Sequence, residues 1–441
     1  MTAPRRRPNL LILLADDLGW GDVSFHGSDI RTPNLDRLAA AGVELDQHYV
    51  CPMCTPTRAC LLTGRHPGRF GRHATVPSNP PVLPDGYETL AGMLRSHGYA
   101  TGLFGKWHLG SAPQHGPNHF GFDYGYGSLA GGCDPYTHRY KCGPHSFTWH
   151  RNGELVEERG HATDLIAAEA GRWIETRTGP WFCYVPFTAV HTPIRAPQHW
   201  IDSYEERRYD PDPARDRSFK TYAAYASQMD FAVGQLVECL ARLGQLDHTI
   251  VLFASDNGAI PGDPLHDTDK YPGRHEEMPR LGSNLPLRGQ KAQLYEGAIR
   301  TPALISWPGH LAARKLTVPI HVTDWMPTFS RLLGCPPSAE PHWDGVDIWP
   351  LLSGEAPRLA RRPFYWNFRG SCFGARDHDL KLIAWETLDP AGCQLFDLGS
   401  DPCETRDLAG EQPETVHRLL EVIAAERQLD DSSKRPDVQV N

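Results

Sequence analysis

The stretch Cys-Thr-Pro-Thr-Arg at residues 54–58 combines a nucleophilic and an anion-binding side chain within five positions. Pro56 suits the first turn of a helix, where its missing N–H is not needed, and Thr55 is a candidate N-cap. The free N–H groups and the positive dipole end of such a helix attract an anion. Arg58, one turn further on, can form paired hydrogen bonds with an oxyanion. The stretch therefore predicts that Cys54 lies beside an anion site.

Other interpretations of Cys54 remain open on these five residues alone. Cys51 and Cys54 form a Cys-x-x-Cys pair, which could be a redox pair or half of a zinc site. The sequence has no second Cys-x-x-Cys, which disfavours structural zinc. A buried, inert thiol is a further alternative, and so is a hydrolase that uses the unmodified cysteine. The rest of the chain has to decide between these readings.

Four apolar runs have the length and composition of strands buried in a parallel sheet. They cover residues 10–15, 99–105, 181–187 and 249–255. A polar cluster follows each run: Asp16 and Asp17, Lys106 and His108, His191, and Asp256 and Asn257. Because ligands of open α/β sheets bind outside the carboxyl ends of the strands, we expect these clusters to share one pocket with Cys54 and Arg58.

The types of side chain in this pocket indicate chemistry on a charged ester. Hard cations such as Ca²⁺, or alternatively Mg²⁺, prefer an all-oxygen ligand set, here Asp16, Asp17, Asp256 and Asn257. A solvated acidic turn is the alternative for the first pair. The cation would neutralise a tetrahedral oxyanion together with Arg58, Lys106 and Lys291. The two histidines, His108 and His191, are candidates for proton transfer.

Several longer motifs resemble those of the type I sulfatases, a family of the alkaline phosphatase superfamily. The first is Cys-x-Pro-x-Arg from Cys54, followed by Ala-x-Leu-Leu-Thr-Gly-Arg with Cys60 at a position where alanine is commoner. Thr57 likewise stands where serine is commoner. The others are Gly-Lys-Trp-His-Leu-Gly at 105–110, the stretch 287–302, and a C-terminal element at 395–408. The resemblance spans nearly the whole chain.

This resemblance implies a specific activity, the hydrolysis of a sulfate monoester, either an aryl sulfate or a sulfated sugar. A separate maturation enzyme would oxidise Cys54 to Cα-formylglycine, whose hydrated aldehyde attacks sulfur, with Arg58 as its partner. The same likeness assigns Ca²⁺ to the four oxygen-donor residues and the sulfate oxygens to Lys106 and Lys291. It makes His191 the group that assists departure of the alcohol and His108 the base that releases sulfate.

The expected fold is α/β, with a large mixed, mostly parallel sheet sandwiched by helices and a smaller C-terminal domain. The length of 441 residues suits this pair. We expect a catalytic domain at 1–355, a linker at 351–362, and a C-terminal domain at 363–441 built on a short antiparallel sheet and a helix at 414–428. Residues 110–160 and 261–281 are expected to be long loops that shape substrate choice.

Candidate substrate contacts in these loops are less specific. Ser128, Asp134 and Tyr136 are candidates for contact with sulfate, because the family's polar residue in this region cannot be aligned. Tyr136, His138, His266 and Trp366 are candidate sugar or aryl contacts, although ordinary surface residues are the stronger interpretation.

Composition limits the partners. The net charge of −9 disfavours nucleic acid or an anionic membrane, and the apolar run near the start is too short for a secretory signal. The odd count of 11 cysteines is typical of reduced thiols, so a cytoplasmic location is expected.

Two alternative functions remain open. One is a phosphate or phosphonate monoester hydrolase of the same superfamily, which Asn257 disfavours; the other is a non-catalytic calcium- or sugar-binding module.

Overall fold

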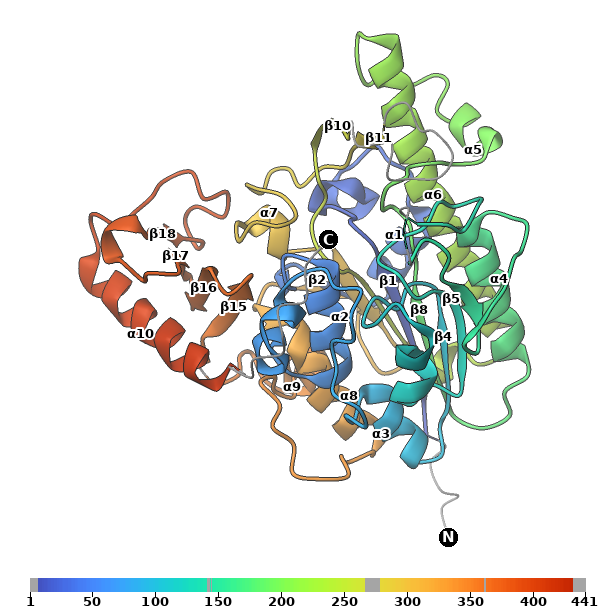
Figure 1. Ribbon diagram of the computed structural model, residues 1–441, viewed down its shortest axis with the longest axis horizontal. Helices are drawn as coiled ribbons and strands as arrows, with labels where there is room; N and C mark the ends of the chain where they lie inside the picture. Colours follow the sequence, from blue (N-terminus) through green and yellow to red (C-terminus); the bar gives the residue numbers. More distant parts are fainter. Residues whose placement is uncertain (1–6, 141–142, 144, 266–277, 361, 431–441) are drawn as a thin grey trace.

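The computed structural model describes residues 7–430 except 141–142, 144, 266–277 and 361 (Figure 1). A ten-stranded sheet forms its centre, with the strand order β13-β2-β12-β9-β1-β8-β4-β5-β6-β7. These strands are β1 Asn9–Ala15, β2 Val43–Leu45, β4 Ala100–Phe104, β5 Tyr124–Ser128, β6 Trp149–Arg151, β7 Glu154–Leu155, β8 Trp181–Pro186, β9 Thr249–Ser255, β12 Ala303–Ser306 and β13 Arg314–Leu316. The central strands β4, β8, β1 and β9 are parallel, while β12 joins β9 antiparallel. This confirms the predicted large mixed, mostly parallel sheet.

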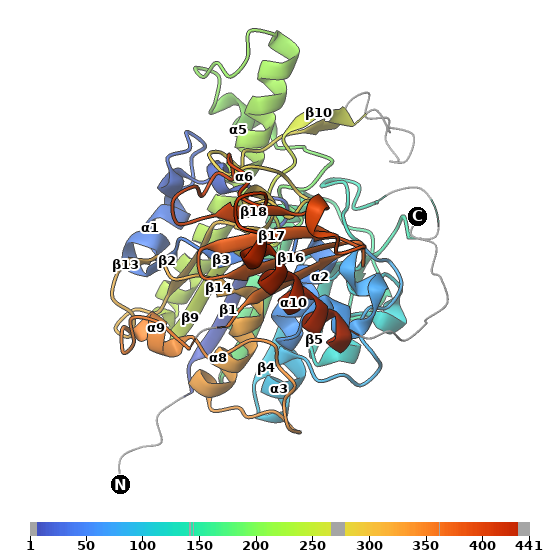
Figure 2. The same cartoon turned by 90° about the vertical axis from the view of Figure 1, so that its left-hand side faces the viewer.

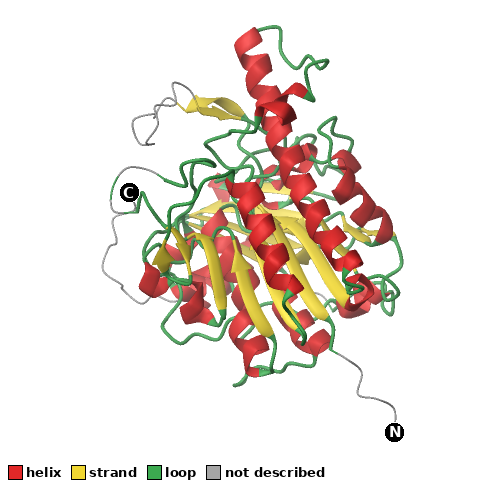
Figure 3. Ribbon diagram, turned by 90° about the vertical axis from the view of Figure 1, so that its right-hand side faces the viewer, coloured by secondary structure: helices red, strands yellow, loops and turns green. Residues whose placement is uncertain are grey.

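Helices cover both faces of the sheet, which explains why its central strands are continuous apolar runs (Figure 3). The helices are α1 Pro33–Ala41, α2 Cys54–Thr63, α3 Leu90–Ser96, α4 Ala162–Glu175, α5 Gln198–Asp202, α6 Pro213–Arg242, α7 Glu296–Ile299, α8 Trp325–Leu333, α9 Trp349–Ser353 and α10 Pro413–Leu429. Alternate side chains of β1 enter opposite cores: Leu10 and Ile12 pack with α2, α3 and α8, whereas Leu11 packs with α1, α4 and α6.

A second sheet follows the large one along the chain (Figure 2). It is antiparallel, in the order β15 Phe364–Phe368, β16 Cys372–Asp377, β17 Leu380–Trp385 and β18 Gln394–Asp397, and α10 packs against one face. The predicted small C-terminal sheet and helix are thereby confirmed, while the domain boundaries at 355 and 363 stay predictions. Of the described helices, none is long and apolar enough to cross a membrane.

Three expectations about loops need correction. The stretch 110–160 contributes β5, β6 and β7 to the main sheet, because Tyr124–Ser128 extends the parallel ladder beside β4. The stretch 261–281 contains an antiparallel pair, β10 Gly262–Leu265 and β11 Met278–Arg280, with the residues between them outside the described part. Helix α9 overlaps the start of the predicted linker. A further short pair joins β3 His48–Tyr49 to β14 Ile320–His321.

Candidate active site

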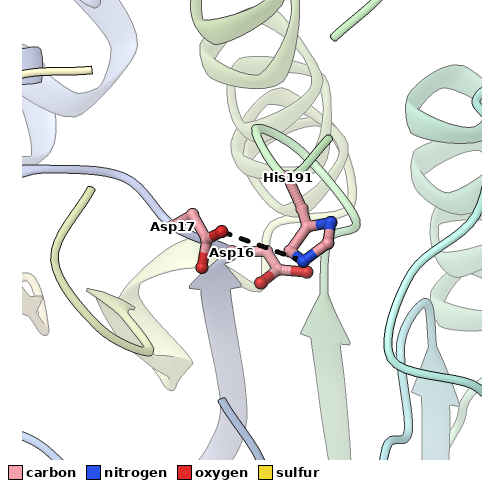
Figure 4. Close-up of side chains that lie close together, drawn as sticks. All are labelled: Asp16, Asp17 and His191. Carbon is pink, nitrogen blue, oxygen red and sulfur yellow. Dashed lines mark ion pairs between the residues drawn. The ribbon is translucent and has the colours of Figure 1, made fainter. Parts of the chain in front are cut away.

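Two pairs of polar residues meet where β1 and β9 end, as the strand pattern predicts. Asp16 and Asp17 follow β1, and Asp256 and Asn257 follow β9, its parallel neighbour. All four side chains are buried. The backbone N–H of Asp17, whose φ is 63°, donates to Asp256 Oδ1 at 3.2 Å, and Asn257 Nδ2 donates to Asp17 Oδ1 at 2.7 Å. Figure 4 shows Asp16 and Asp17 at the tip of β1.

Cys54 is the first residue of α2, a helix whose ten residues are all buried. The expectation that Thr55 caps this helix is wrong, because Met53 is the N-cap and Thr55 lies inside the first turn. The Thr55 hydroxyl instead donates to the His108 carbonyl at 3.1 Å. Cys54 Sγ lies 3.2 Å from His108 Nδ1. Burial raises the pKa of the Cys54 thiol, which keeps the unmodified side chain neutral.

The Cys-x-x-Cys spacing does not bring its two sulfurs into a pair. The sulfur beside Cys51 is that of Cys60, at 3.5 Å, while Cys54 faces His108. The described cysteines are free thiols. This geometry disfavours a redox pair of Cys51 and Cys54.

Arg58 links the nucleophile helix to the ends of two strands. Its side chain is fully buried, and Nε and Nη2 donate to Asp256 Oδ2 at 3.1 and 2.7 Å. Its Nη1 donates to the carbonyl oxygen of Lys106 at 2.7 Å. Arg58 thus fixes the position of Cys54 relative to β9 and to the residues after β4.

The two predicted lysines lie on different segments of the chain and bind the same acidic pair, Asp16 and Asp17. Lys106 follows β4 and donates to Asp16 Oδ2 at 2.7 Å. Lys291 precedes α7 and donates to Asp17 Oδ1 and Oδ2 at 2.6 and 2.9 Å. Burial alone would raise the pKa of Asp17, but Lys291 and His191 outweigh it and hold that pKa well below its usual range. The pocket therefore alternates acidic and basic groups.

Both histidines lie in the pocket and are largely buried. His191 Nδ1 is 2.6 Å from the Thr192 carbonyl, so it carries the proton and leaves Nε2, which is 3.8 Å from Asp17 Oδ2, as the basic nitrogen (Figure 4). Burial lowers the pKa of His191 to about 3 and that of His108 well below its usual range, with Lys106 and Arg58 adding to the latter shift. His108 adopts a left-handed backbone conformation, with a φ of 57°.

Two glycines beside the histidines were missed by sequence reasoning. A Cβ atom on Gly131 would lie 2.4 Å from His108 Nε2, and one on Gly132 would lie 3.1 Å from His191 Nδ1. Only residues without a side chain let this segment approach both rings. The Gly-Gly pair at residues 131–132 was the available signal in the sequence.

The candidate substrate contacts lie in different environments. Asp134 is buried and binds Arg195 at 2.8 Å, while the Ser128 hydroxyl donates to the Ala130 carbonyl. Tyr136 is 37% exposed and lies under the Arg195 guanidinium. The prediction that Trp366 and His138 are candidate sugar or aryl contacts is wrong, because both side chains are buried. Trp366 donates to the Val50 carbonyl, and His138 stacks on Trp149. His266 lies outside the described residues.

The oxygen-donor set fits a hard cation. Within the described part of the chain, two of its buried oxygens, Asp16 Oδ1 and Asn257 Oδ1, have no hydrogen-bond partner. Leaving such atoms unpaired is costly, and a cation would satisfy both. Ligand atoms of Asp16, Asp17 and His191 lie within 4.8 Å of one another, as do those of Asp16, Cys54 and Asp256. The residues present can therefore hold Ca²⁺ or Mg²⁺.

Fold and site together define an α/β protein with a cluster of buried carboxylates, basic residues and histidines at the carboxyl ends of its parallel strands, where ligands of such sheets bind. A family model described as Sulfatase matches residues 8–335, and one described as N-sulphoglucosamine sulphohydrolase, C-terminal, matches residues 290–428. The chain belongs to the sulfatase family, the sulfuric ester hydrolases of the alkaline phosphatase superfamily.

Individual relatives agree with this assignment. The chain is 35% identical to mouse arylsulfatase J over 80% of its own length and 57% of that protein's length. It is 32% identical to human N-acetylgalactosamine-6-sulfatase, with 93% of the chain and 77% of the relative covered. Among solved structures, Ps i-CgsB in complex with k-i-k-neocarrahexaose superposes with a TM-score of 0.83 at 30% identity, covering 97% of this chain and 94% of that one.

Proposed function

We propose that this protein hydrolyses a sulfate monoester, a sulfated sugar or an aryl sulfate, to the alcohol and inorganic sulfate. Its nucleophile would be formylglycine made from Cys54, and its cation Ca²⁺. The observation that carries the proposal is the position of Cys54, at the buried start of α2 and 3.2 Å from His108 Nδ1, inside a shell of basic and oxygen-donor groups. The carbohydrate complex of Ps i-CgsB and the name of N-acetylgalactosamine-6-sulfatase support a sulfated sugar as the substrate.

The unmodified thiol is a poor candidate for the nucleophile. Burial raises its pKa, and a protonated thiol neither attacks an ester nor binds a metal well. Formylglycine, once formed by a maturation enzyme, would supply a hydrated aldehyde whose hydroxyl serves as the nucleophile. This chain's contribution is to place that position at a helix start, where the dipole and free N–H groups favour an anion.

The charges of the side chains around Cys54 support the proposed cation. Three ion pairs join basic side chains to carboxylates, so the charges of these six side chains sum to zero. The pairs are Arg58–Asp256, Lys106–Asp16 and Lys291–Asp17. A bound Ca²⁺ would supply two positive charges, which makes the pocket attractive to an anionic ester. The ammonium groups of the two lysines then serve as donors to the ester oxygens.

The two histidines are placed to transfer protons to or from different groups of the reaction. His108 Nδ1 is within reach of the residue-54 side chain, so it is the group that can take a proton from the nucleophile or return one. His191 donates from Nδ1 to the Thr192 carbonyl, which orients Nε2 towards the acidic pair. Once protonated at Nε2, His191 can donate to the oxygen of the departing alcohol.

The test combines peptide mass spectrometry with an assay on 4-nitrophenyl sulfate, after expression in a host that has the maturation enzyme. Conversion of cysteine to formylglycine replaces the sulfur and two hydrogens by one oxygen and lowers the peptide mass by about 18 Da. We expect activity to track the fraction converted and to vanish in Cys54→Ala. If the mass is unchanged and phosphate or phosphonate esters turn over faster than sulfates, the phosphohydrolase alternative replaces this proposal.

A further inference from the structure

Asn284 lies where three segments of the candidate active site meet. It belongs to the stretch that joins β11 to α7 and that also carries Lys291 (Figure 1). Its side chain is buried, with 3% of its surface exposed. A Cβ atom on Gly19 would lie 2.8 Å from Asn284 Oδ1, and one on Gly258 would lie 3.0 Å from the same oxygen. The loops that follow β1 and β9 therefore both pass directly against this amide.

The amide of Asn284 makes three hydrogen bonds, and each of them goes to the main chain. Its Oδ1 accepts from the Ala259 N–H at 2.8 Å, and its Nδ2 donates to the carbonyl oxygens of Ala259 and Gly289 at 3.0 Å each. Ala259 lies two positions after Asn257, and Gly289 lies two positions before Lys291. One side chain thus joins the loop of a proposed cation ligand to the loop of a proposed sulfate-binding lysine.

The Ala259 carbonyl is shared between Asn284 and the lysine itself. The backbone N–H of Lys291 donates to this carbonyl at 3.2 Å, and the Lys291 ammonium group donates to Asp17 Oδ1 at 2.6 Å. Asn284 therefore fixes the main chain on both sides of the contact: it holds the carbonyl that accepts from Lys291, and it holds Gly289 just before the lysine. The direction in which the lysine side chain leaves the main chain depends on these bonds.

The segment that carries Asn284 is itself anchored by a buried carboxylate. Asp22 accepts from the Ser283 N–H and from the Gly19 N–H, both at 2.8 Å, and from the Tyr222 hydroxyl at 2.6 Å. Because Gly19 belongs to the loop after β1 and Tyr222 to α6, these bonds fix the segment against two other elements. Asn284 thus acts on the lysine loop from an anchored position.

We propose that Asn284 is a positioning residue for the sulfatase reaction, which holds the Lys291 ammonium group where the sulfate oxygens need a donor. The inference deepens the proposed function and rests on it. Without the amide, the Ala259 N–H and the Gly289 carbonyl lose their partner, and the lysine loop is free to shift relative to Asp17. A misplacement of about 1 Å by a substitution remote from the reacting atoms can lower the rate about 100-fold.

The test compares wild-type protein with Asn284→Ala, Lys291→Met and the double variant, each shown by peptide mass spectrometry to be matured to the same extent. The values of kcat and KM are measured with 4-nitrophenyl sulfate. Asn367→Ala is the matched control: Asn367 is also buried, donates to Asp430 at 2.7 Å and accepts from the Gly370 N–H at 2.9 Å, but it lies on β15 in the C-terminal sheet. The same proteins are compared by urea unfolding, which requires no activity.

We expect Asn284→Ala to lower kcat/KM about 100-fold, and to divide the loss between kcat and KM as Lys291→Met does. Asn367→Ala should lower kcat/KM less than about threefold. In the Lys291→Met background, Asn284→Ala should also cost less than about threefold, because the group that it positions is already gone. In urea, Asn284→Ala should raise the unfolding constant about tenfold less in that background than in the wild type.

Positioning through Lys291 is refuted if Asn284→Ala retains wild-type activity, if Asn367→Ala loses as much, or if the loss persists in the Lys291→Met background. Additive effects in urea unfolding refute it as well, and they decide the question if Lys291→Met is too inactive to measure. Absence of aryl sulfate turnover in matured wild-type protein would refute the proposed function instead. The unfolding comparison would still show whether Asn284 holds Lys291, so the two failures are distinguishable.

Discussion

Replacing Arg58 by methionine tests whether the pocket is held together by charge. Arg58 and Asp256 are both fully buried, and two guanidinium nitrogens donate to one carboxylate oxygen. Methionine retains much of the apolar stem, so the loss of packing is small. What remains is a buried carboxylate without its partner, whose pKa is already raised by burial and by Asp16. Removing one member of a buried ion pair costs about 3–5 kcal/mol of the free energy of unfolding.

The loss in free energy of unfolding depends on which other positive charge neutralises Asp256. If Asp256 is a Ca²⁺ ligand, the ion offsets part of the loss, so Arg58→Met costs less in Ca²⁺ than in EDTA. The assay is urea unfolding of wild type and variant in both buffers. Arg406→Ala is the control, because the Arg406–Glu411 pair is exposed on both sides and such pairs contribute little.

The double variant Arg58→Met/Asp256→Asn separates charge from shape. It removes both charges, and buried pairs replaced by neutral groups are often tolerated. We expect it to recover most of the stability lost in Arg58→Met measured in EDTA. A double variant as unstable as the single one would refute this reasoning, and would show that Arg58 stabilises the fold by its shape and its bond to the Lys106 carbonyl instead.

Three further predictions concern other buried charges and polar groups. Chelation with EDTA should lower the melting temperature and activity, and added Ca²⁺ should restore both, because a ligand of the native state stabilises it; an unchanged melting temperature contradicts the metal assignment. Lys381→Met should cost about 3–5 kcal/mol in urea unfolding, because it removes the cation that Glu404 contacts and leaves buried Glu296 with the more distant Arg300 at 3.8 Å; a loss below that of an exposed pair contradicts it. Burial lowers the pKa of His48 to about 3, and its Nε2 accepts from Trp325, so stability is lost as pH falls from 6.5 towards 3, by about 5 kcal/mol in all; His48→Gln should remove this slope from pH-dependent unfolding curves.

The strand-end part of the site could be predicted because its geometry follows from the fold class. Parallel strands bring their carboxyl ends to one edge, so residues directly after β1, β4 and β9 had to meet there. The strands themselves could be predicted as well, because burial on both faces makes each of them a continuous run of apolar residues. Placing Asp16 beside Lys106, 90 positions apart, needed no more than this rule.

The misses have local physical causes. Proline needs no N–H acceptor anywhere in the first turn, so Pro56 does not determine which residue caps α2, and the Thr55 hydroxyl was free to hold the His108 carbonyl instead. Gly131 carries no functional group, and its importance appears only when the ring of His108 lies against it. Strand β5 alternates tyrosine and glycine, a composition typical of a loop, and it is a strand because β4 pairs with it.

Composition suggests a linker between two units, yet the buried charges tie the C-terminal sheet to the catalytic loop. Lys381 of β17 contacts Glu296 at the start of α7 at 2.8 Å, and Glu404 at 2.7 Å. Glu404 also accepts the Glu296 backbone N–H at 2.7 Å. Because Glu296 lies only five positions after Lys291, these contacts anchor the segment that carries this lysine to Asp17. The C-terminal sheet is therefore part of what positions the active site.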